Sequence, residues 1–218
     1  MRVIAIDGPA GAGKSTVAKR LASILQCAYL DTGAMYRALT LKALRQGINL
    51  DDEDKLVELA NKTSIDLEGD FEKLKVFLDG EDVSEEIRTL NVTNHTFYVA
   101  RAPRVREIMV RWQRSVGSKK SVVVEGRDVT TVVFPNAYRK FYLDGNVEER
   151  AKRRIKELEA KGQMVDAAQL LKDVQERDEK DLTRKYGALK KADDAIYIDS
   201  TPLTAEQVVE EMLKHIKN

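Results

Sequence analysis

The residues Gly8–Ser15 have the spacing G-x-x-x-x-G-K-S, which is typical of a loop that binds the phosphates of a nucleotide. Glycines let the backbone curl so that N–H groups point at phosphate oxygens, and a following helix N-terminus adds partial positive charge. We expect Lys14 to reach the β- and γ-phosphates and the Ser15 hydroxyl to ligate Mg²⁺. The residues predicted to bind the triphosphate are Gly8, Pro9, Ala10, Gly11, Ala12, Gly13, Lys14, Ser15 and Thr16.

This loop predicts triphosphate binding but leaves open whether the outcome is phosphoryl transfer, hydrolysis coupled to motion, or switching. A GTPase would carry the guanine-binding string N/T-K-x-D, and the sequence has none. A motor or transporter ATPase would carry an apolar strand ending in an acid far downstream, for which Val122–Glu125 is the nearest candidate. Gly126, Arg127 and Asp128 follow that strand, and this combination suits a site for a phosphoryl acceptor better.

Several arginines have a spacing that suits such a transfer, which needs cations around the moving group and around an anionic acceptor. Arg37 lies one turn into a predicted helix and Arg127 directly follows a buried strand, so both should lie near the loop. Arg106 flanks the apolar stripe of a helix over 103–116, at the rim of a pocket. Two further sets of residues each share one helix face: Arg150, Arg153 and Arg154, and Arg177, Asp181 and Arg184. The alternative interpretation is that these faces are exposed to solvent and that their charged residues form ordinary salt bridges.

The elements that must position these residues alternate between short apolar runs and helical patterns. This alternation predicts an α/β fold with a parallel sheet flanked by helices. Each predicted strand ends in an acidic residue, and the carboxyl ends of parallel strands share the edge where ligands bind. The predicted strands are 3–7, 28–31, 121–125, 139–144 and 195–199, and the predicted helices are 14–26, 34–45, 103–116 and 204–215.

Two segments break the alternation. Residues 48–96 are polar and rich in turns, with short strands expected at 64–67 and 75–78, and they predict a small inserted subdomain. Residues 146–190 are helical, heavily charged and interrupted at Lys161–Gly162, with too few apolar residues for a core, so we expect them on the surface. The predicted core domain comprises residues 1–47, 97–145 and 191–218.

Composition excludes several classes of protein. The 218 residues include 43% hydrophobic and 33% charged residues, and the formal net charge of +1 gives no general attraction to nucleic acid or anionic membranes. The single cysteine, Cys27, rules out an internal disulfide and fits a reducing compartment. No apolar run approaches the roughly 20 residues that a membrane helix requires. We therefore expect a cytoplasmic protein that is a monomer and binds neither nucleic acid nor membrane.

Taken together, these motifs resemble the bacterial-type cytidylate kinases, P-loop kinases of nucleoside monophosphates. The resemblance covers nearly the whole chain. The strings GRD…TVVFP and DG…DVS…IRT are far more specific than the phosphate loop alone. The matching strings are IDGPAGAGKST at 6–16, LDTGAMYRALT at 30–40, LDGEDVSEEIRT at 78–89, PRVRE at 103–107, EGRDVTTVVFPNA at 125–137, ERAKRR at 149–154, ERDEKD at 176–181 and IDSTPLT at 198–204.

The resemblance implies ATP as donor, Mg²⁺ as cofactor and CMP or dCMP as acceptor. It also implies a P-loop core, a monophosphate-binding insertion at 48–96, and a segment 146–190 that comprises a lid at about 146–165 and helices that contact the substrates. Arg106 and Asp128 would read the cytosine edge, because its N4 amino group suits a carboxylate and its N3 and O2 suit a guanidinium. The implied acceptor-binding residues are Thr32, Arg37, Arg106, Arg127, Asp128, Arg177, Asp181 and Arg184.

The catalytic residues implied in the same way are Lys14, Arg127, Arg154 and Arg184, with Arg153 as a further contact to ATP. The chain departs from the family pattern where a small hydroxyl residue usually faces the base, since Phe97 stands there, and where Thr130 replaces a glycine. The competing interpretations are a kinase of the same fold for UMP, AMP or a coenzyme precursor, and a P-loop switch or binding module.

Overall fold

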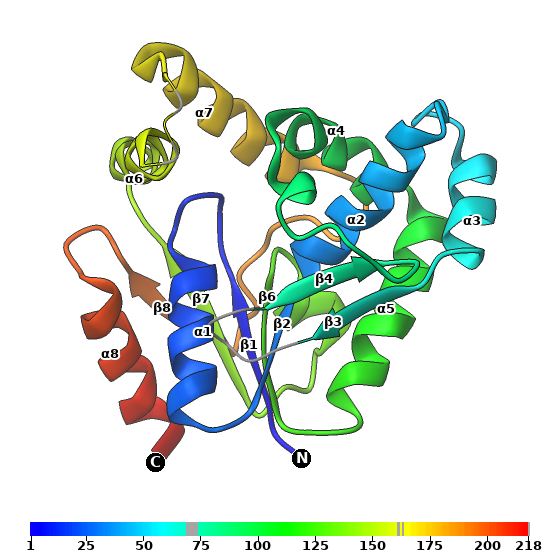
Figure 1. Cartoon of the computed structure of the whole chain (residues 1–218). Coiled ribbons are helices and arrows are strands. Elements are labelled where there is room, and N and C mark those ends of the chain that lie inside the picture. Colours follow the sequence, from blue (N-terminus) through cyan, green and yellow to red (C-terminus); the bar gives the residue numbers. More distant parts are fainter. Residues whose placement is uncertain (69–73, 161, 163, 218) are drawn as a thin grey trace.

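The computed structural model describes residues 1–68, 74–160, 162 and 164–217. A parallel five-stranded sheet with the strand order β2-β6-β1-β7-β8 forms its centre (Figure 1). The chain passes from β1 to β2 at the edge of the sheet and later returns to β6, which lies between them. Because β1 is the central strand, the phosphate loop that follows it lies in the middle of the sheet edge. The strands are β1 (Val3–Asp7), β2 (Ala28–Asp31), β6 (Val122–Gly126), β7 (Arg139–Asp144) and β8 (Ile196–Asp199).

Strand register confirms that the acidic strand ends lie together at one edge. Asp31 pairs with Glu125, and Asp144 pairs with Asp199. Asp7 pairs with Gly126, one residue beyond Glu125. The carboxyl ends of all five strands therefore lie along one edge of the sheet, and the predicted site residues that follow β1, β2 and β6 lie at this edge.

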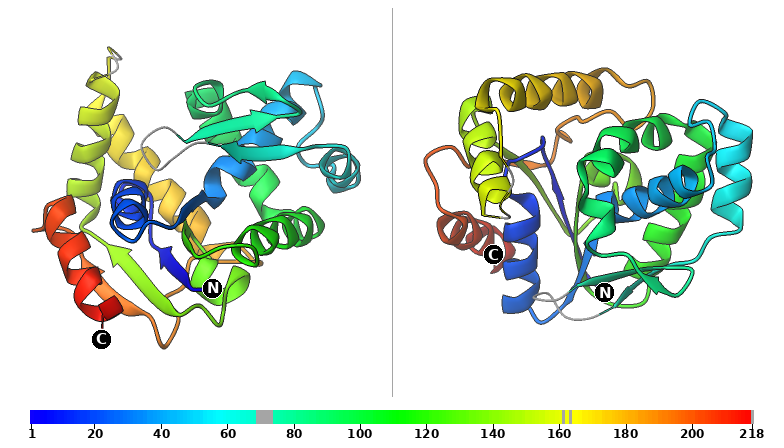
Figure 2. Two further views of the ribbon diagram at one scale, coloured as in Figure 1. Left: turned by 60° about the horizontal axis from the view of Figure 1, so that its bottom comes forward. Right: turned by 45° about the horizontal axis from the view of Figure 1, so that its top comes forward.

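Both faces of the sheet are covered by helices, as the alternating pattern predicts. On one face α1 and α8 pack side by side on Ile6, Val123 and Phe141 (Figure 2). On the other face α2 and α5 form a core with Leu30 and Val124, and α3 packs against α5 and α2. The helices are α1 (Lys14–Ile24), α2 (Thr32–Arg45), α3 (Glu53–Asn61), α4 (Leu90–Arg101), α5 (Pro103–Gly117), α6 (Val147–Glu159), α7 (Ala167–Thr183) and α8 (Ala205–Lys217), with short turns η1 (Glu86–Arg88) and η2 (Val129–Val133).

A second, antiparallel sheet lies within residues 48–96. Its strands β3 (Ile65–Glu68), β4 (Lys75–Leu78) and β5 (Glu81–Asp82) pack on α2 through a core that includes Val76, Ile87 and Val92. The same segment also contains helix α3, which sequence analysis did not predict, and Leu56 of α3 is fully buried in the main core. The boundary of the insertion at residue 48 stays a prediction. Residues 69–73 of the insertion lie outside the described residues.

The charged segment 146–190 forms two packed helices above the edge of the sheet, α6 and α7 (Figure 2). Most residues of α7 are exposed, as expected, but Val174 and Asp181 are buried, and α6 is less exposed, with Arg150, Ala151 and Leu158 buried. The break between the helices includes Gly162 with a φ of 73°. Lys161 and Gln163 of the predicted lid lie outside the described residues, and the extent of the lid stays a prediction.

Several predicted element boundaries are wrong by one or two residues. The second helix begins at Thr32 rather than Ala34, because Asp31 ends its strand and its carboxylate accepts the Ala34 N–H at 2.8 Å. The first helix ends at Ile24 rather than at residue 26, since Gln26 takes a positive φ of 49° that no helix interior allows. The remaining shifts are strand 65–68 for 64–67, strand 122–126 for 121–125, strand 196–199 for 195–199, helix 103–117 for 103–116 and helix 205–217 for 204–215.

Candidate active site

The phosphate loop runs from the end of β1 to the start of α1 in a backbone that requires glycine. A side chain on Gly8 would place its Cβ 1.9 Å from the Leu143 carbonyl oxygen of β7. Gly13 has a φ of 90° and precedes α1 without a side chain to cap the helix. The first N–H groups of α1 therefore have no partner within the helix and suit the oxygens of an anion.

The side chains of Lys14 and Ser15 in this loop lie close to the strand ends. Lys14 is buried and its Nζ donates a hydrogen bond to the Pro9 carbonyl at 2.7 Å. The Ser15 hydroxyl donates a short hydrogen bond to Glu125, which also accepts a hydrogen bond from the Tyr29 hydroxyl at 3.1 Å. Glu125, at the end of β6, thus orients the Ser15 hydroxyl, which is the side chain predicted to ligate Mg²⁺.

Burial lowers the pKa of Lys14 to about 7, helped by the Arg127 guanidinium and opposed by Glu125 and Asp181. We expect ATP to restore an ordinary lysine pKa, because a polyphosphate favours the charged ammonium. Binding at pH 8 should therefore take up a proton, and binding at pH 5.5 should not, because Lys14 is then already charged.

Titration calorimetry of ATP in buffers of different ionisation enthalpy measures this uptake. The variant Lys14→Met provides the baseline for protons that belong to the nucleotide itself. Equal proton uptake by the wild type and the variant at pH 8 would contradict a neutral Lys14.

The start of α2 places Thr32 and Arg37 at the carboxyl ends of β6 and β2. The Thr32 hydroxyl donates to the Glu125 carbonyl at 2.8 Å. Arg37 forms a 2.9 Å ion pair with Asp31, and Arg88 of η1 reaches within 4.0 Å of the same carboxylate. Burial opposes ionisation of Asp31, but Arg37 and Arg88 outweigh it and lower its pKa. The buried Nε of Arg37 has no hydrogen-bond partner within the described part of the chain, so this guanidinium keeps donor capacity for an anion.

Arg106, Asp128 and Arg184 form a buried cluster from three distant parts of the chain. Arg106 contacts Asp128 through a short ion pair and donates to the Ala100 carbonyl at 3.1 Å. Arg184 lies 3.7 Å from the other Asp128 oxygen. Burial raises the pKa of Asp128, and the two guanidinium groups counteract it. The structure therefore brings together the pair that was predicted to read a base.

Arg127, Arg177 and Asp181 form a second cluster next to the first. Arg127 donates to Asp181 at 2.7 Å, and Arg184 lies 4.0 Å from the other oxygen of this carboxylate. Burial lowers the pKa of Arg177 to about 10, and the nearby cations Arg127, Arg37 and Arg154 contribute to the shift. The guanidinium groups of Arg127, Arg177 and Arg184 thus gather around the Asp181 carboxylate, which is an arrangement suited to an anionic ligand.

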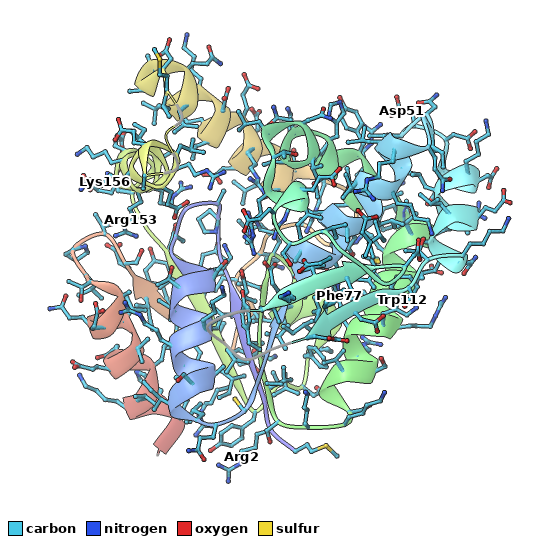
Figure 3. All side chains as sticks on the ribbon, viewed as in Figure 1. Arg2, Asp51, Phe77, Trp112, Arg153 and Lys156 are labelled. Carbon is cyan, nitrogen blue, oxygen red and sulfur yellow. The ribbon has the colours of Figure 1, made fainter. Side chains whose placement is uncertain are left out.

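The three arginines of α6 take different positions although their spacing predicts one face. Arg150 donates to the Ala10 carbonyl at 2.8 Å and pairs with Asp178 of α7 at 2.6 Å, so it joins the phosphate loop to α7. Arg153, on the side of α6 toward the loop after β8, donates to the Ser200 hydroxyl at 3.0 Å (Figure 3). Arg154 pairs with Glu157 at 2.9 Å. Their predicted roles over the phosphates stay predictions.

Phe97 and Thr96 lie on α4, where the resemblance expects a hydroxyl residue against the base. Arg101 lies over the Phe97 ring, 5.7 Å from its centroid. The Thr96 hydroxyl donates to the Val92 carbonyl at 2.7 Å, so it is occupied within its own helix. Phe97 offers no hydroxyl to a base, and a base contact from Thr96 in its place stays a prediction.

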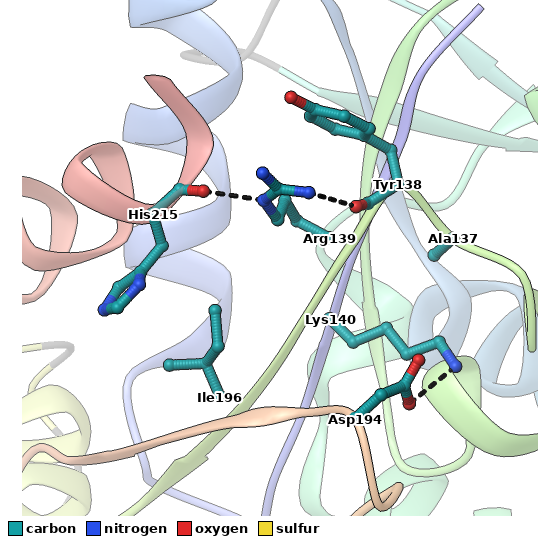
Figure 4. A pocket seen from close by; sticks show the side chains of 7 residues that line it. All are labelled: Ala137, Tyr138, Arg139, Lys140, Asp194, Ile196 and His215. Carbon is teal, nitrogen blue, oxygen red and sulfur yellow. Dashed lines mark hydrogen bonds and ion pairs between the residues drawn. The ribbon is translucent and has the colours of Figure 1, made fainter. Parts of the chain in front are cut away.

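A cavity of about 460 Å³ opens at the opposite edge of the sheet, at the amino ends of β7 and β8 (Figure 4). Its cations already have structural partners. Arg139 donates to the carbonyl of His215 at 2.6 Å and so caps the end of α8, and Lys140 pairs with Asp194 at 2.8 Å. The cavity is therefore explained by packing of α8 and lies away from the phosphate loop.

The described residues contain no group of three or more His, Cys, Asp or Glu side chains that could hold a metal ion by themselves. A Mg²⁺ ion would take few protein ligands at such a site and would rely on phosphate oxygens and water. Ser15, supported by Glu125, fits that role. No helix among the described residues is long and apolar enough to cross a membrane.

A phosphate loop at the centre of a parallel sheet edge, facing a group of buried arginines, defines the P-loop kinase class of proteins. The fold resembles that of the shikimate kinase of Bacteroides thetaiotaomicron, with a TM-score of 0.50 and 14% identity over 100% of this chain and 99% of that one. The chain belongs to the cytidylate kinase family, whose model matches residues 4–218.

Two curated cytidylate kinases show how close the relationship is. The one from Caldanaerobacter subterraneus subsp. tengcongensis is 51% identical over 98% of this chain and 94% of its own length. The one from Pediococcus pentosaceus is 50% identical over 99% of this chain and 95% of its own length. The family membership predicted from the sequence motifs is confirmed.

Proposed function

We propose that this chain transfers the γ-phosphoryl group of ATP to the phosphate of CMP or dCMP, giving ADP and CDP or dCDP. The observation that carries the proposal is the buried pair of Arg106 and Asp128 next to the arginine cluster that faces the phosphate loop. A carboxylate accepts the N4 amino group of cytosine, and a guanidinium donates to N3 and O2. Uracil, with a carbonyl at position 4, would leave Asp128 without a donor, which is strongly unfavourable in a buried site.

The remaining arginines suit the other parts of the acceptor. Arg37, Arg127 and Arg184 would hold the acceptor phosphate, since guanidinium groups pair with phosphate through two parallel hydrogen bonds. Arg177 and Asp181 would face the sugar hydroxyls. Burial lowers the pKa of Arg177 and the cations around it contribute, which supports an anionic acceptor phosphate nearby, because an anion would offset this positive charge.

The donor would lie on residues 8–16, with Lys14 at the β- and γ-phosphates and Arg153 and Arg154 approaching from the lid. When bound, Mg²⁺ would neutralise negative charge on the triphosphate. Ser15 would hold it, oriented by Glu125, to which the Tyr29 hydroxyl also donates.

Catalysis then consists of positioning and charge neutralisation. The acceptor phosphate is already an ionised nucleophile, so none of the carboxylates needs to act as a general base. Arg127 would stabilise charge that develops on the transferred group. Closure of α6 and α7 would exclude water, which otherwise competes as an acceptor.

Product analysis tests the proposal. ATP and Mg²⁺ are mixed with the protein and, separately, with CMP, dCMP, UMP and AMP, and the nucleoside diphosphates are separated by chromatography. We expect CDP and dCDP as the main products. A preference for UMP or AMP would favour a kinase for another acceptor, and slow ATP hydrolysis without a phosphorylated product would favour a switch module. The monomeric state and the cytoplasmic location stay predictions.

A further inference from the structure

Asp7, the last residue of β1, has a fully buried side chain whose hydrogen bonds all come from one distant turn. Its Oδ1 accepts the Val129 N–H at 2.8 Å. Its Oδ2 accepts both the N–H and the hydroxyl of Thr130, at 2.7 and 2.6 Å. One carboxylate thus satisfies three donors at the start of η2.

The turn η2 begins directly after Asp128. An aspartate in this position normally caps the helix with its own side chain. The Asp128 carbonyl accepts the N–H groups of Val132 and Val133 at 2.8 and 3.2 Å, which closes the turn. The first N–H groups of such a turn need an outside acceptor, and the side chain of the preceding aspartate is the usual one. The Asp128 side chain makes no capping bond, and its carboxylate faces Arg106 and Arg184 instead.

We propose that Asp7 is a positioning residue that caps η2 in place of Asp128 and so keeps the Asp128 carboxylate turned toward the base of the acceptor. The inference rests on the proposed function, because it takes Asp128 as the group that reads cytosine. Asp7 also precedes Gly8 directly, so one residue fixes both the start of the phosphate loop and the carboxylate of the acceptor site. The Thr130 hydroxyl strengthens the cap by a third hydrogen bond.

Without the Asp7 cap, Asp128 becomes the nearest acceptor for the N–H groups of η2. Its side chain would turn back onto its own turn and leave Arg106. The variant Asp7→Asn is nearly isosteric but has one acceptor oxygen, so its NH₂ group must face a backbone N–H of η2, either that of Val129 or that of Thr130. We expect it to lower the ratio of kcat/KM for CMP to that for UMP by about tenfold or more, with the KM for ATP changed by less than about threefold.

Two variants of Thr130 give a milder test that does not depend on a change at Asp7. Thr130→Val keeps the shape but removes one of the three donors, so it should lower the CMP-to-UMP ratio by a smaller factor, about threefold. Thr130→Ser restores the hydroxyl and should restore the ratio. If both Thr130 variants retain the wild-type ratio, or if Asp7→Asn slows CMP and UMP equally, the positioning role is wrong and the cap serves stability alone.

A double-mutant cycle separates action through Asp128 from an independent effect. If Asp7 acts through Asp128, then Asp7→Asn together with Asp128→Asn should have the same CMP-to-UMP ratio as Asp128→Asn alone, within about twofold. Ratios that multiply would overturn the inference. The wild-type protein distinguishes this failure from failure of the proposed function, because a wild type without CMP preference contradicts the function itself.

Discussion

Arg127→Ala is expected to lower kcat with CMP by about 10³-fold or more, the range observed for arginines that stabilise charge during phosphoryl transfer. Arg127 follows β6 directly, and its ion pair to Asp181 holds its half-buried guanidinium in a fixed place. A loss of about 10³ corresponds to about 4 kcal/mol of transition-state stabilisation, more than an exposed charge supplies. Steady-state kinetics with saturating ATP and CMP measure the change.

Two control variants show whether the effect depends on this arginine's position and shape. Arg111→Ala removes an exposed guanidinium from α5 and should leave kcat unchanged. Arg127→Lys keeps the charge but loses the planar pair of donors, so it should recover only part of the rate. Melting temperatures for each variant identify any loss of folding, because Asp181 loses its 2.7 Å partner in Arg127→Ala. Near wild-type turnover of a folded Arg127→Ala protein would refute the role.

The sheet could be predicted from the sequence because its strands carry strong local signals. Three consecutive valines make β6 a fully buried strand, and the five acidic strand ends mark one edge. The phosphate loop was predictable for the same reason, since its glycines, lysine and serine are contiguous in the sequence. Arg106 was expected at a pocket rim from its place beside the stripe of α5, and the structure places it against Asp128.

Contacts between distant segments could not be predicted in this way. Arg150 donates to a carbonyl of the phosphate loop 140 residues earlier, and Asp7 accepts hydrogen bonds from Thr130, 123 residues later. Glu125 was considered as the acid that ends an apolar strand, but its hydrogen bond with Ser15 was not predicted. These contacts depend on strand order and helix packing, which leave no periodic signal in the sequence. Helix α3 was missed because its nine residues carry only three buried apolar side chains, too few for a clear pattern.

Base selection should depend on a single charge at Asp128. Replacing this residue by asparagine keeps its shape but adds an amide N–H₂ group, which can donate to the carbonyl at position 4 of uracil. We expect Asp128→Asn to lower the ratio of kcat/KM for CMP to that for UMP by about 10²-fold or more, mostly through poorer use of CMP. The ratio is measured with both acceptors under identical ATP and Mg²⁺ concentrations.

The ratio is a sharper readout than the rate for CMP alone, because Asp128 also neutralises two buried cations. Removal of its charge leaves Arg106 and Arg184 less compensated, and this loss should slow both acceptors to a similar degree. Only the contact with position 4 of the base distinguishes cytosine from uracil, so a change in the ratio isolates it. Asp199→Asn, an exposed acid at the end of β8, should leave the ratio unaltered. An unchanged ratio in Asp128→Asn would remove this carboxylate from base recognition and leave the acceptor identity to be explained by other residues.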